Sequence, residues 1–378
     1  MRRSPQRRIC FAAIRWVGES VRYLLVGSPE AYSGKSAIIL GLAHLFQERG
    51  VDIAYGKPMG TCLSESEADT LDEDVRFIAA TLNLPESHLR PTLLSLDADT
   101  IARRIRGEDP TDYQQALSAY GRMQGGSLVL LEGPGTLDEG YLFDLTLPQM
   151  AEVLDAPVLL VSRYHSELVV DSLLASKRVL GDRLQGVLLN DVPLDQVEAV
   201  EANVRPFLES KGIPVLAVLP RSDLLRSVSV AELVHQLNAE VLCCPDRLDL
   251  MVESLKIGAM NVNSALKYFR KSRNMAVVTG GDRPDIQLAA LETSTHCLIL
   301  TGQIPPTPAV LSRAEDLEVP ILSVDLDTLT TVEIIDRTFG QVRLHESIKV
   351  QHIRQLMQSH FDLERLMSAL ALEPVATA

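Results

Sequence analysis

The chain has 378 residues, 46% of them hydrophobic and 23% charged, and its formal net charge at neutral pH is −14. This length and composition predict about two folded domains and exclude a fibrous or wholly disordered protein. An acidic surface repels phosphate backbones and anionic lipids, so we expect no nucleic acid and no membrane as partner. Five scattered cysteines without a Cys-x-x-Cys pair indicate a cytoplasmic protein rather than a disulfide or zinc framework.

Residues 1–20 differ from the rest of the chain in composition. The first 22 residues contain six arginines and a single acid, Glu19. Arg15 interrupts their one apolar run before a signal-peptide core would be complete. We interpret residues 1–20 as a basic N-terminal extension, disordered or misassigned, and keep a targeting segment and an ordered arm as alternatives.

Residues 21–221 repeat one pattern, a short apolar run followed by a helical period. This pattern is typical of parallel βαβ layers with buried strands. The predicted strands are 23–26, 53–56, 128–131, 158–161, 186–189 and 215–219. The predicted helices are 35–49, 69–82, 113–123, 167–180 and 197–210. The first domain is therefore predicted to be α/β, with a doubly wound parallel sheet.

Residues 222–345 predict a second, smaller α/β domain. Its predicted strands are 240–243, 275–278, 297–300 and 320–324, and its predicted helices are 259–269, 284–292, 307–317 and 328–337. Residues 346–378 form a C-terminal helix and tail, because apolar residues recur there near the helical period. We expect this helix to pack on the second domain or on a partner chain. A membrane-lying helix is the alternative, which its mixed-charge polar face disfavours.

The strongest functional signal is a loop between the first strand and the first helix, which ends in Gly34-Lys35-Ser36. Loop N–H groups and a helix N-terminus bind phosphate oxygens, the lysine neutralises their charge, and the hydroxyl reaches Mg²⁺. The G-x-x-x-x-G-K-S pattern is imperfect, because Pro29 stands where glycine is expected and Gly27 lies two residues earlier. We interpret the loop as a variant ATP and Mg²⁺ site, with a simple helix cap as the alternative.

Charged residues follow or precede neighbouring elements of the same domain. Glu132 directly follows the strand at 128–131 and opens a Gly-Pro-Gly turn. Asp74 lies at the start of the second helix, and Lys57 directly follows the second strand. Doubly wound sheets bind ligands at the carboxyl ends of their strands, so we expect these side chains near the phosphates. The alternatives are a polar strand end, a helix-dipole charge and a solvated surface lysine.

Four short stretches together resemble the dethiobiotin synthetase-like P-loop proteins, and most closely the N-terminal half of the long bacterial phosphotransacetylases. They are the G-K-S loop, K-P-M-G from Lys57, L-V-L-L-E-G-P-G ending at Gly135, and G-V-L-L-N-D-V-P from Gly186. The resemblance implies nucleotide contacts from Gly27, Ser33, Gly34, Lys35, Ser36 and Asn190, with Asn190 facing the adenine. It implies Mg²⁺ ligands at Ser36, Asp74 and Glu132. Lys35 and Lys57 are the implied catalytic residues.

The second domain resembles a DRTGG domain, whose naming motif reads D-R-T-F-G at residues 336–340, with Phe339 in place of one glycine. A further stretch of this family, G-D-R-P-D-I, follows a strand and opens a helix. Its glycines and exposed helix N–H groups make a possible second anion site at Gly281, Asp282 and Arg283. The alternative is a tight turn in which Asp282 caps the helix.

The resemblance implies a regulatory protein that binds Mg-ATP and an unidentified second small molecule, as a homo-oligomer. In the phosphotransacetylases an acetyltransferase domain follows the DRTGG domain, so we do not expect acetyl transfer from residues 1–378. The alternative is an ATP-dependent ligase of the dethiobiotin synthetase or cobyrinic acid synthase type, with Lys57 holding the acceptor. A scaffold with a degenerate loop is a third interpretation. Partition ATPases carry a second lysine where this chain has Glu30, so their switching is not expected.

Overall fold

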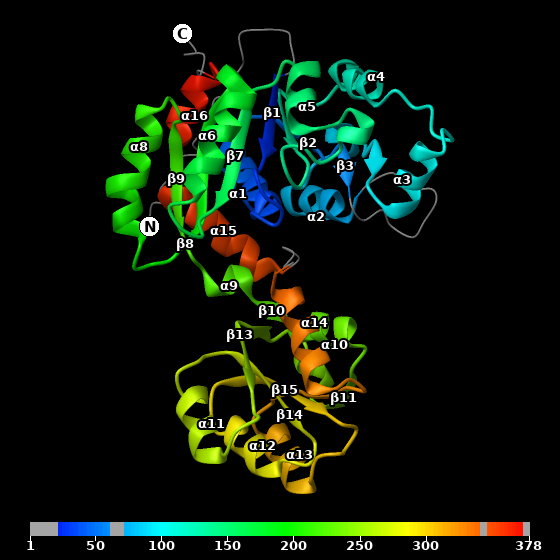
Figure 1. Ribbon diagram of the computed structural model, residues 1–378, viewed down its shortest axis with the longest axis vertical. Coiled ribbons are helices and arrows are strands. Elements are labelled where there is room, and N and C mark those ends of the chain that lie inside the picture. Colours follow the sequence, from blue (N-terminus) through cyan, green and yellow to red (C-terminus); the bar gives the residue numbers. More distant parts are fainter. Residues whose placement is uncertain (1–21, 61–71, 341–345, 373–378) are drawn as a thin grey trace, which may run out of the picture. The chain divides into compact units, whose positions relative to one another are not determined.

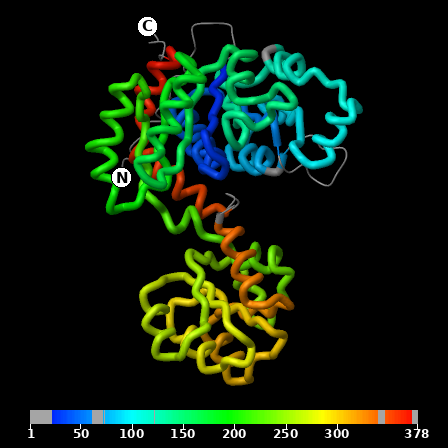
Figure 2. Tube along the Cα trace, in the orientation of Figure 1, coloured from blue at the N-terminus to red at the C-terminus, as the bar shows by residue number. Residues whose placement is uncertain are grey.

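The computed structural model describes residues 22–60, 72–340 and 346–372 (Figures 1 and 2). The chain divides into two compact units. The first comprises Met1–Arg221 together with His345–Ala378, and the second comprises Ser222–Leu344. The first unit contains a parallel sheet and the second a mostly parallel one, each flanked by helices, which confirms the predicted α/β class with a smaller second domain.

The first unit is built on a seven-stranded sheet with the order β4-β2-β6-β1-β7-β8-β9. All neighbouring strands in it are parallel. Its strands are β1 (Arg22–Gly27), β2 (Ile53–Gly56), β4 (Leu89–Arg90), β6 (Leu128–Glu132), β7 (Val158–Arg163), β8 (Leu184–Val192) and β9 (Val215–Pro220). The six predicted strands are confirmed, and β4 is a short additional edge strand. A separate two-stranded ladder joins β3 (Met59–Gly60) and β5 (Leu94–Ser95).

Helices cover both faces of this sheet, which explains why its strands are almost entirely buried. The helices of the first unit before residue 221 are α1 (Lys35–Glu48), α2 (Glu73–Leu82), α3 (Ala98–Ile105), α4 (Tyr113–Ser118), α5 (Leu147–Val153), α6 (Val169–Leu180), α7 (Val197–Ala199) and α8 (Arg205–Ser210). The helix predicted at 197–210 contains a π-helical turn at Val200–Val204. The first residues of the helix predicted at 69–82 lie outside the described residues.

The C-terminal helices α15 (Ser347–His360) and α16 (Leu363–Ala369) belong to the first unit. Helix α15 packs directly on α1, where a Cβ added to Gly41 would lie 2.5 Å from Cγ of Met357. The expectation that the tail packs on the second domain or on a partner chain was therefore wrong. The helical period correctly identified an apolar stripe, but a period carries no information about which surface covers it.

The second unit contains a five-stranded sheet with the order β11-β16-β15-β14-β13. Its strands are β11 (Glu240–Cys243), β13 (Ser254–Ile257), β14 (Met275–Gly280), β15 (Thr295–Thr301) and β16 (Ile321–Ser323), and only β11 runs antiparallel to its neighbour. A short hairpin pairs β10 (Val228–Ser229) with β12 (Met251–Val252). The helices are α9 (Asp223–Arg226), α10 (Val230–Leu237), α11 (Val262–Phe269), α12 (Pro284–Leu291), α13 (Pro308–Asp316) and α14 (Thr328–Gly340). The four predicted strands are confirmed.

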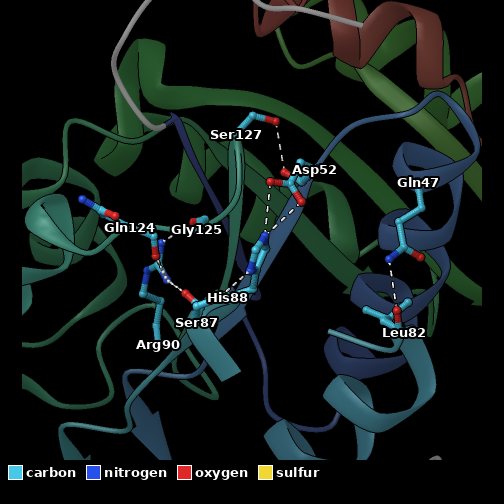
Figure 3. Close-up of polar contacts among 9 residues, drawn as sticks. All are labelled: Gln47, Asp52, Leu82, Ser87, His88, Arg90, Gln124, Gly125 and Ser127. Atoms are coloured by element: carbon cyan, nitrogen blue, oxygen red, sulfur yellow. Dashed lines mark hydrogen bonds and ion pairs between the residues drawn. The ribbon is translucent and has the colours of Figure 1, made fainter. Parts of the chain in front are cut away.

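A fully buried arginine fixes the edge of the larger sheet (Figure 3). Arg90 in β4 donates from Nη2 to the carbonyl of Gly125 at 2.7 Å and from Nη1 to the carbonyls of Ser87 and Gln124, each at 3.4 Å. Gly56 leaves room for it, since a Cβ there would lie 2.4 Å from Cβ of Arg90. These contacts join β4 to the turn before β6, next to the pairing of β4 with β2.

Candidate functional site

The loop between β1 and α1 has the geometry of a phosphate-binding turn. Gly34 precedes α1 with φ at +94°, a left-handed conformation that glycine adopts without strain. A Cβ at Gly34 would lie 2.6 Å from Nδ2 of Asn190, so the loop backbone approaches β8 closely. Ser33 is buried, and its hydroxyl has no hydrogen-bond partner among the described residues. The loop thus ends at a helix N-terminus with backbone N–H groups available for an anion.

Side chains hold the loop where the usual glycine is missing. The hydroxyl of Ser28 donates to the carbonyl of Glu30 at 2.6 Å and accepts from the N–H of Glu30 at 3.1 Å. This closes a tight turn around Pro29. Gly27 allows Leu147 to pack against the start of the loop, because a Cβ there would lie 2.2 Å from Cδ2 of Leu147. The substitution of Pro29 for glycine is therefore accommodated locally.

Glu132 lies beside the phosphate loop because β6 pairs with β1 in a register that places it opposite Val26. One carboxylate oxygen, Oε1, accepts a hydrogen bond from Oγ of Ser36 at 3.0 Å. The other, Oε2, accepts one from the hydroxyl of Tyr55 at 3.0 Å. Burial raises the pKa of Glu132, whereas the nearby ammonium of Lys57 opposes this rise. The structure thus brings together the predicted Ser36 and Glu132.

Lys57 is buried at the end of β2 and is not the solvated surface lysine of the alternative interpretation. Its Nζ lies 2.7 Å from Oδ2 of Asp74 and 3.1 Å from Oδ1 of Asp72. Burial alone would lower the pKa of Lys57, but the carboxylates of Glu132, Asp74 and Asp72 outweigh it and raise the pKa above its ordinary value. Lys57 is therefore charged at neutral pH and neutralises an acidic cluster.

The sequence analysis missed Tyr55 and gave no separate role to Asp72, and both are parts of this arrangement. Tyr55 lies within an apolar strand and looks like an ordinary core residue until its hydroxyl is placed on Glu132. Asp72 caps α2, since its Oδ1 accepts from the N–H of Asp74 at 2.9 Å as well as from Lys57. An acid two residues before another acid at a helix start was the signal available for Asp72.

Lys35, the first residue of α1, points its ammonium toward the turn after β6. Nζ lies 3.4 Å from the carbonyl of Gly135, and the N–H of Gly135 donates to Glu139. Burial lowers the pKa of Lys35, while Glu132 and Glu139 act in the opposite direction. A phosphate bound at the loop would supply the negative charge that stabilises the ammonium form.

Asn190, near the end of β8, contacts the phosphate loop directly. Its Nδ2 donates to the carbonyl of Ser33 at 2.9 Å. The amide therefore holds the loop in place just before Gly34. Its predicted contact with an adenine stays a prediction.

The possible second anion site lies at the turn between β14 and α12. Arg283 donates to Asp285 from Nε at 3.1 Å and to the carbonyl of Met260 from Nη2 at 3.1 Å. Gly281 is required by close packing, since a Cβ there would lie 2.0 Å from the carbonyl oxygen of Ile304. Arg283 itself is the cap residue of α12 and makes no side-chain cap bond, so the interpretation that Asp282 caps this helix was wrong. Anion binding at Gly281, Asp282 and Arg283 stays a prediction.

A divalent cation has a suitable but incomplete set of ligands here. Within the described ranges, no three His, Cys, Asp or Glu side chains gather closely enough to hold a metal by themselves. The hydroxyl of Ser36 and the carboxylate of Glu132 are adjacent, whereas Asp74 faces Lys57. Mg²⁺ commonly takes one or two protein ligands and completes its octahedron with phosphate oxygens and water. These donors fit Mg²⁺ bound together with a nucleotide.

Two family profiles match the chain in succession. The profile described as AAA domain matches residues 22–229, which is more than half of the chain, and the DRTGG domain profile matches residues 232–338. The chain belongs to the AAA domain family. It is a P-loop AAA domain followed by a DRTGG domain, which confirms the resemblance drawn from the short motifs. Across the part of the chain that the structure describes, no helix is both long and apolar enough to span a bilayer.

The chain is also similar to several curated proteins over part of their length. The phosphate acetyltransferase of Nitratidesulfovibrio vulgaris is 27% identical over 374 residues, which cover 92% of this chain and 51% of that protein. The chain spans about half the length of the phosphate acetyltransferases it matches. The ATP-dependent dethiobiotin synthetase of Bacillus subtilis subsp. natto is 22% identical over 225 residues, 58% of this chain and 95% of that protein. The CBS and DRTGG domains of a Clostridium perfringens pyrophosphatase, solved with diadenosine tetraphosphate, give a TM-score of 0.28 at 17% identity, covering 47% of this chain and 89% of that one.

Proposed function

We propose that the AAA domain binds ATP with Mg²⁺ at the loop between β1 and α1, and that the chain is a nucleotide-binding regulatory protein. The observation that carries this proposal is the 3.0 Å contact between Oγ of Ser36 and Oε1 of Glu132, made at the carboxyl ends of adjacent parallel strands. A hydroxyl after the lysine of the loop and an acid on the neighbouring strand are the two groups that a nucleotide-bound Mg²⁺ requires.

The individual residues have distinct roles in this proposal. The loop backbone from Gly27 to Gly34 and the N-terminus of α1 bind phosphate oxygens, and Lys35 neutralises them. Ser36 and Glu132 hold Mg²⁺, with Asp74 as its second acidic neighbour. When bound, Mg²⁺ supplies positive charge to the phosphates and fixes their orientation. Asn190, which donates to the carbonyl of Ser33, is proposed to contact the adenine as well.

The regulatory part of the proposal concerns the DRTGG domain. We propose that it binds a second small molecule, with Gly281, Asp282 and Arg283 as an anion site, and that the protein acts as a homo-oligomer. In such regulation, bound nucleotide changes the affinity of the protein for the second ligand. The bound second ligand changes the affinity for nucleotide by the same factor.

An ATP-dependent ligase is a second candidate function, favoured by the match over 95% of a dethiobiotin synthetase. Lys57 would bind the anion of an acceptor whose carboxyl or carbamate is phosphorylated. Its ammonium is already paired with Asp72 and Asp74, so an acceptor would have to compete with two carboxylates. This competition makes the ligase the weaker candidate.

Calorimetry with Mg-ATP tests the nucleotide site on the full chain. Lys35→Ala and Ser36→Ala should each weaken binding, the first by at least about 30-fold, equivalent to about 2 kcal/mol. Lys271→Ala, at an exposed lysine of the second unit, is the matched control and should bind like the parent. Equal affinity in the parent and in Lys35→Ala would identify the loop as a scaffold element.

Two further measurements separate the alternatives. Phosphate release that depends on an added carboxylate or amine substrate would support the ligase, whereas binding with little release supports the regulatory protein. For the DRTGG domain, pyrophosphate binding is measured in Lys35→Ala, which removes the first site, and again in Lys35→Ala with Arg283→Ala. Equal pyrophosphate affinity in the two variants would contradict the second anion site.

A further inference from the structure

Ion pairs join the carboxyl ends of three consecutive strands, β7, β8 and β9. Oδ2 of Asp191 lies 2.9 Å from Nε of Arg163, and its Oδ1 lies 3.1 Å from Nε of Arg221. The Asp191 side chain is only 10% exposed, whereas the side chains of Arg163 and Arg221 are 23% and 38% exposed. Asp191 also has a φ of +60°, which is uncommon outside glycine. One carboxylate therefore pairs with two arginines, at a backbone position that is uncommon for residues other than glycine.

The first of these arginines connects to the phosphate loop. The backbone N–H of Arg163 donates to Oε1 of Glu30 at 2.9 Å, and Nε2 of His165 lies 3.1 Å from Oε2 of the same carboxylate. Glu30 belongs to the loop, and its backbone N–H and carbonyl both hydrogen-bond to the hydroxyl of Ser28. A change in the loop on phosphate binding would therefore act on Arg163 and, through it, on Asp191.

The second arginine stands where the first unit ends. Arg221 is the last residue of that unit before the chain enters the second unit at Ser222. Its backbone N–H donates to the carbonyl of Val192 at 2.7 Å, and its side chain pairs with Asp191. Both attachments lead to the end of β8. The position of the chain at this junction thus depends on how Asp191 is held.

We propose that Asp191 is a positioning residue that couples the phosphate loop to the junction at Arg221, through the contacts Glu30–Arg163–Asp191–Arg221. The proposal rests on the proposed nucleotide site and assigns the path by which that site is regulated. Nucleotide at the loop shifts Glu30, which changes how Arg163 shares the Asp191 carboxylate with Arg221. Coupling is reciprocal, so displacement of the junction by the DRTGG domain changes nucleotide affinity. Asp191 acts here through other residues and is not assigned a contact with the nucleotide.

Hydrogen exchange of the full chain with and without Mg-ATP tests the proposal. In the parent, nucleotide should slow exchange in the phosphate loop and also change exchange in residues 221–230 by about fivefold. In Asp191→Asn the loop should still be protected, while the change at residues 221–230 is lost. Asp195→Asn, at an exposed acid four residues later, is the control and should behave like the parent.

Two other variants keep the proposal testable if Asp191→Asn does not fold. Arg221→Gln breaks only the last contact and should give protection of the loop without a change at residues 221–230. Glu30→Gln, measured without nucleotide, should change exchange at residues 221–230, and this effect should disappear in combination with Arg221→Gln.

The outcomes distinguish the two proposals. No protection of the loop in the parent would overturn the nucleotide site and this coupling with it. Loop protection without any change at residues 221–230 in the parent, or an undiminished change in both Asp191→Asn and Arg221→Gln, would overturn the coupling alone.

Discussion

The two parallel sheets of this protein end in chemically different edges. At the carboxyl ends of β1, β2 and β6, buried charged groups meet, including Lys57, Asp72 and Glu132. At the carboxyl ends of β14 and β15, the buried polar groups are neutral: Thr279 donates to the carbonyl of Gly258 at 3.2 Å, and the hydroxyls of Thr301 and Thr328 lie 3.0 Å apart. Burying a charged group costs free energy unless the group is paired. A sheet edge that contains several buried charges therefore indicates a functional role as well as a structural one.

Because of this difference between the two edges, a specific ligand can be proposed for the first unit but not for the second. The charge and geometry of the first unit's edge are the basis on which phosphate with a divalent cation is proposed as its ligand. The neutral edge of the second unit satisfies its own hydrogen bonds, and Arg283 pairs with a residue of the same turn. Neutral groups whose hydrogen bonds are already made within the domain do not indicate the charge or the chemical class of a ligand.

The largest expected effect comes from removing the central cation of the charged edge. Lys57→Met leaves Asp72 and Asp74 without their ammonium partner next to buried Glu132, and should destabilise the first unit by about 4 kcal/mol. Urea unfolding measures this loss. Combination with Asp72→Asn should restore part of it, because one of the unpaired charges is removed. A Lys57→Met variant as stable as the parent would contradict the view that Lys57 is needed to neutralise this cluster.

Removing the phenol that supports Glu132 should have a smaller effect. Tyr55→Phe deletes the hydrogen bond to Oε2 of a buried carboxylate and should cost about 2 kcal/mol in unfolding free energy. It should also weaken the dependence of ATP affinity on Mg²⁺ concentration, because Glu132 is less well oriented. Tyr164→Phe, at another buried tyrosine of the first unit, serves as the control and should leave the Mg²⁺ dependence unchanged.

A pH effect is expected on the opposite side of α1, where it meets α15. Burial lowers the pKa of His44 to about 4, with Arg354 adding to the shift and Glu48 opposing it. The unfolded chain then binds a proton more readily than the folded chain, so stability is complete above pH ~6.5 and falls between pH ~6.5 and ~4, by up to about 2 kcal/mol. Urea unfolding at several pH values measures it, and His44→Gln should flatten this part of the profile. An unchanged profile in His44→Gln would show that other groups cause the loss.

The smallest effect is expected at the neutral edge. Thr301→Val removes one hydroxyl from the pair with Thr328 and should cost the second unit about 1 kcal/mol. ATP affinity at the first unit should stay the same. A loss above about 3 kcal/mol would mean that a hydroxyl at the neutral edge contributes as much to the free energy of unfolding as a charged group at the other edge.

Most of the fold could be predicted because strands that are buried on both faces consist of continuous apolar residues, which are easily recognised in the sequence. The partly exposed edge strand β13 was missed, since Ser254–Ile257 mixes polar and apolar residues. Lys35, Ser36 and Glu132 could be proposed from local motifs, and the structure brings Ser36 and Glu132 into contact, while their roles stay predictions. Asp72 was given no role, although an acid just before a helix favours capping. Tyr55 was missed because its role depends on Glu132, which is distant in the sequence. For the same reason, α15 was predicted to pack on the second domain or on a partner chain instead of on α1.

The return of α15 to the first unit has a consequence for dissecting this protein. The second unit is an insertion within the first, because the chain leaves the first unit after Arg221 and comes back to it at α15. A chain cut after Arg221 would lose the helix that covers Gly41 and would expose the apolar flank of α1, the helix that begins with Lys35. Loss of nucleotide binding in such a fragment would then result from the exposed flank of α1 and would not show that the second unit takes part in binding. Replacing residues 222–344 with a flexible linker that retains α15 is therefore the change that keeps every residue of the first unit.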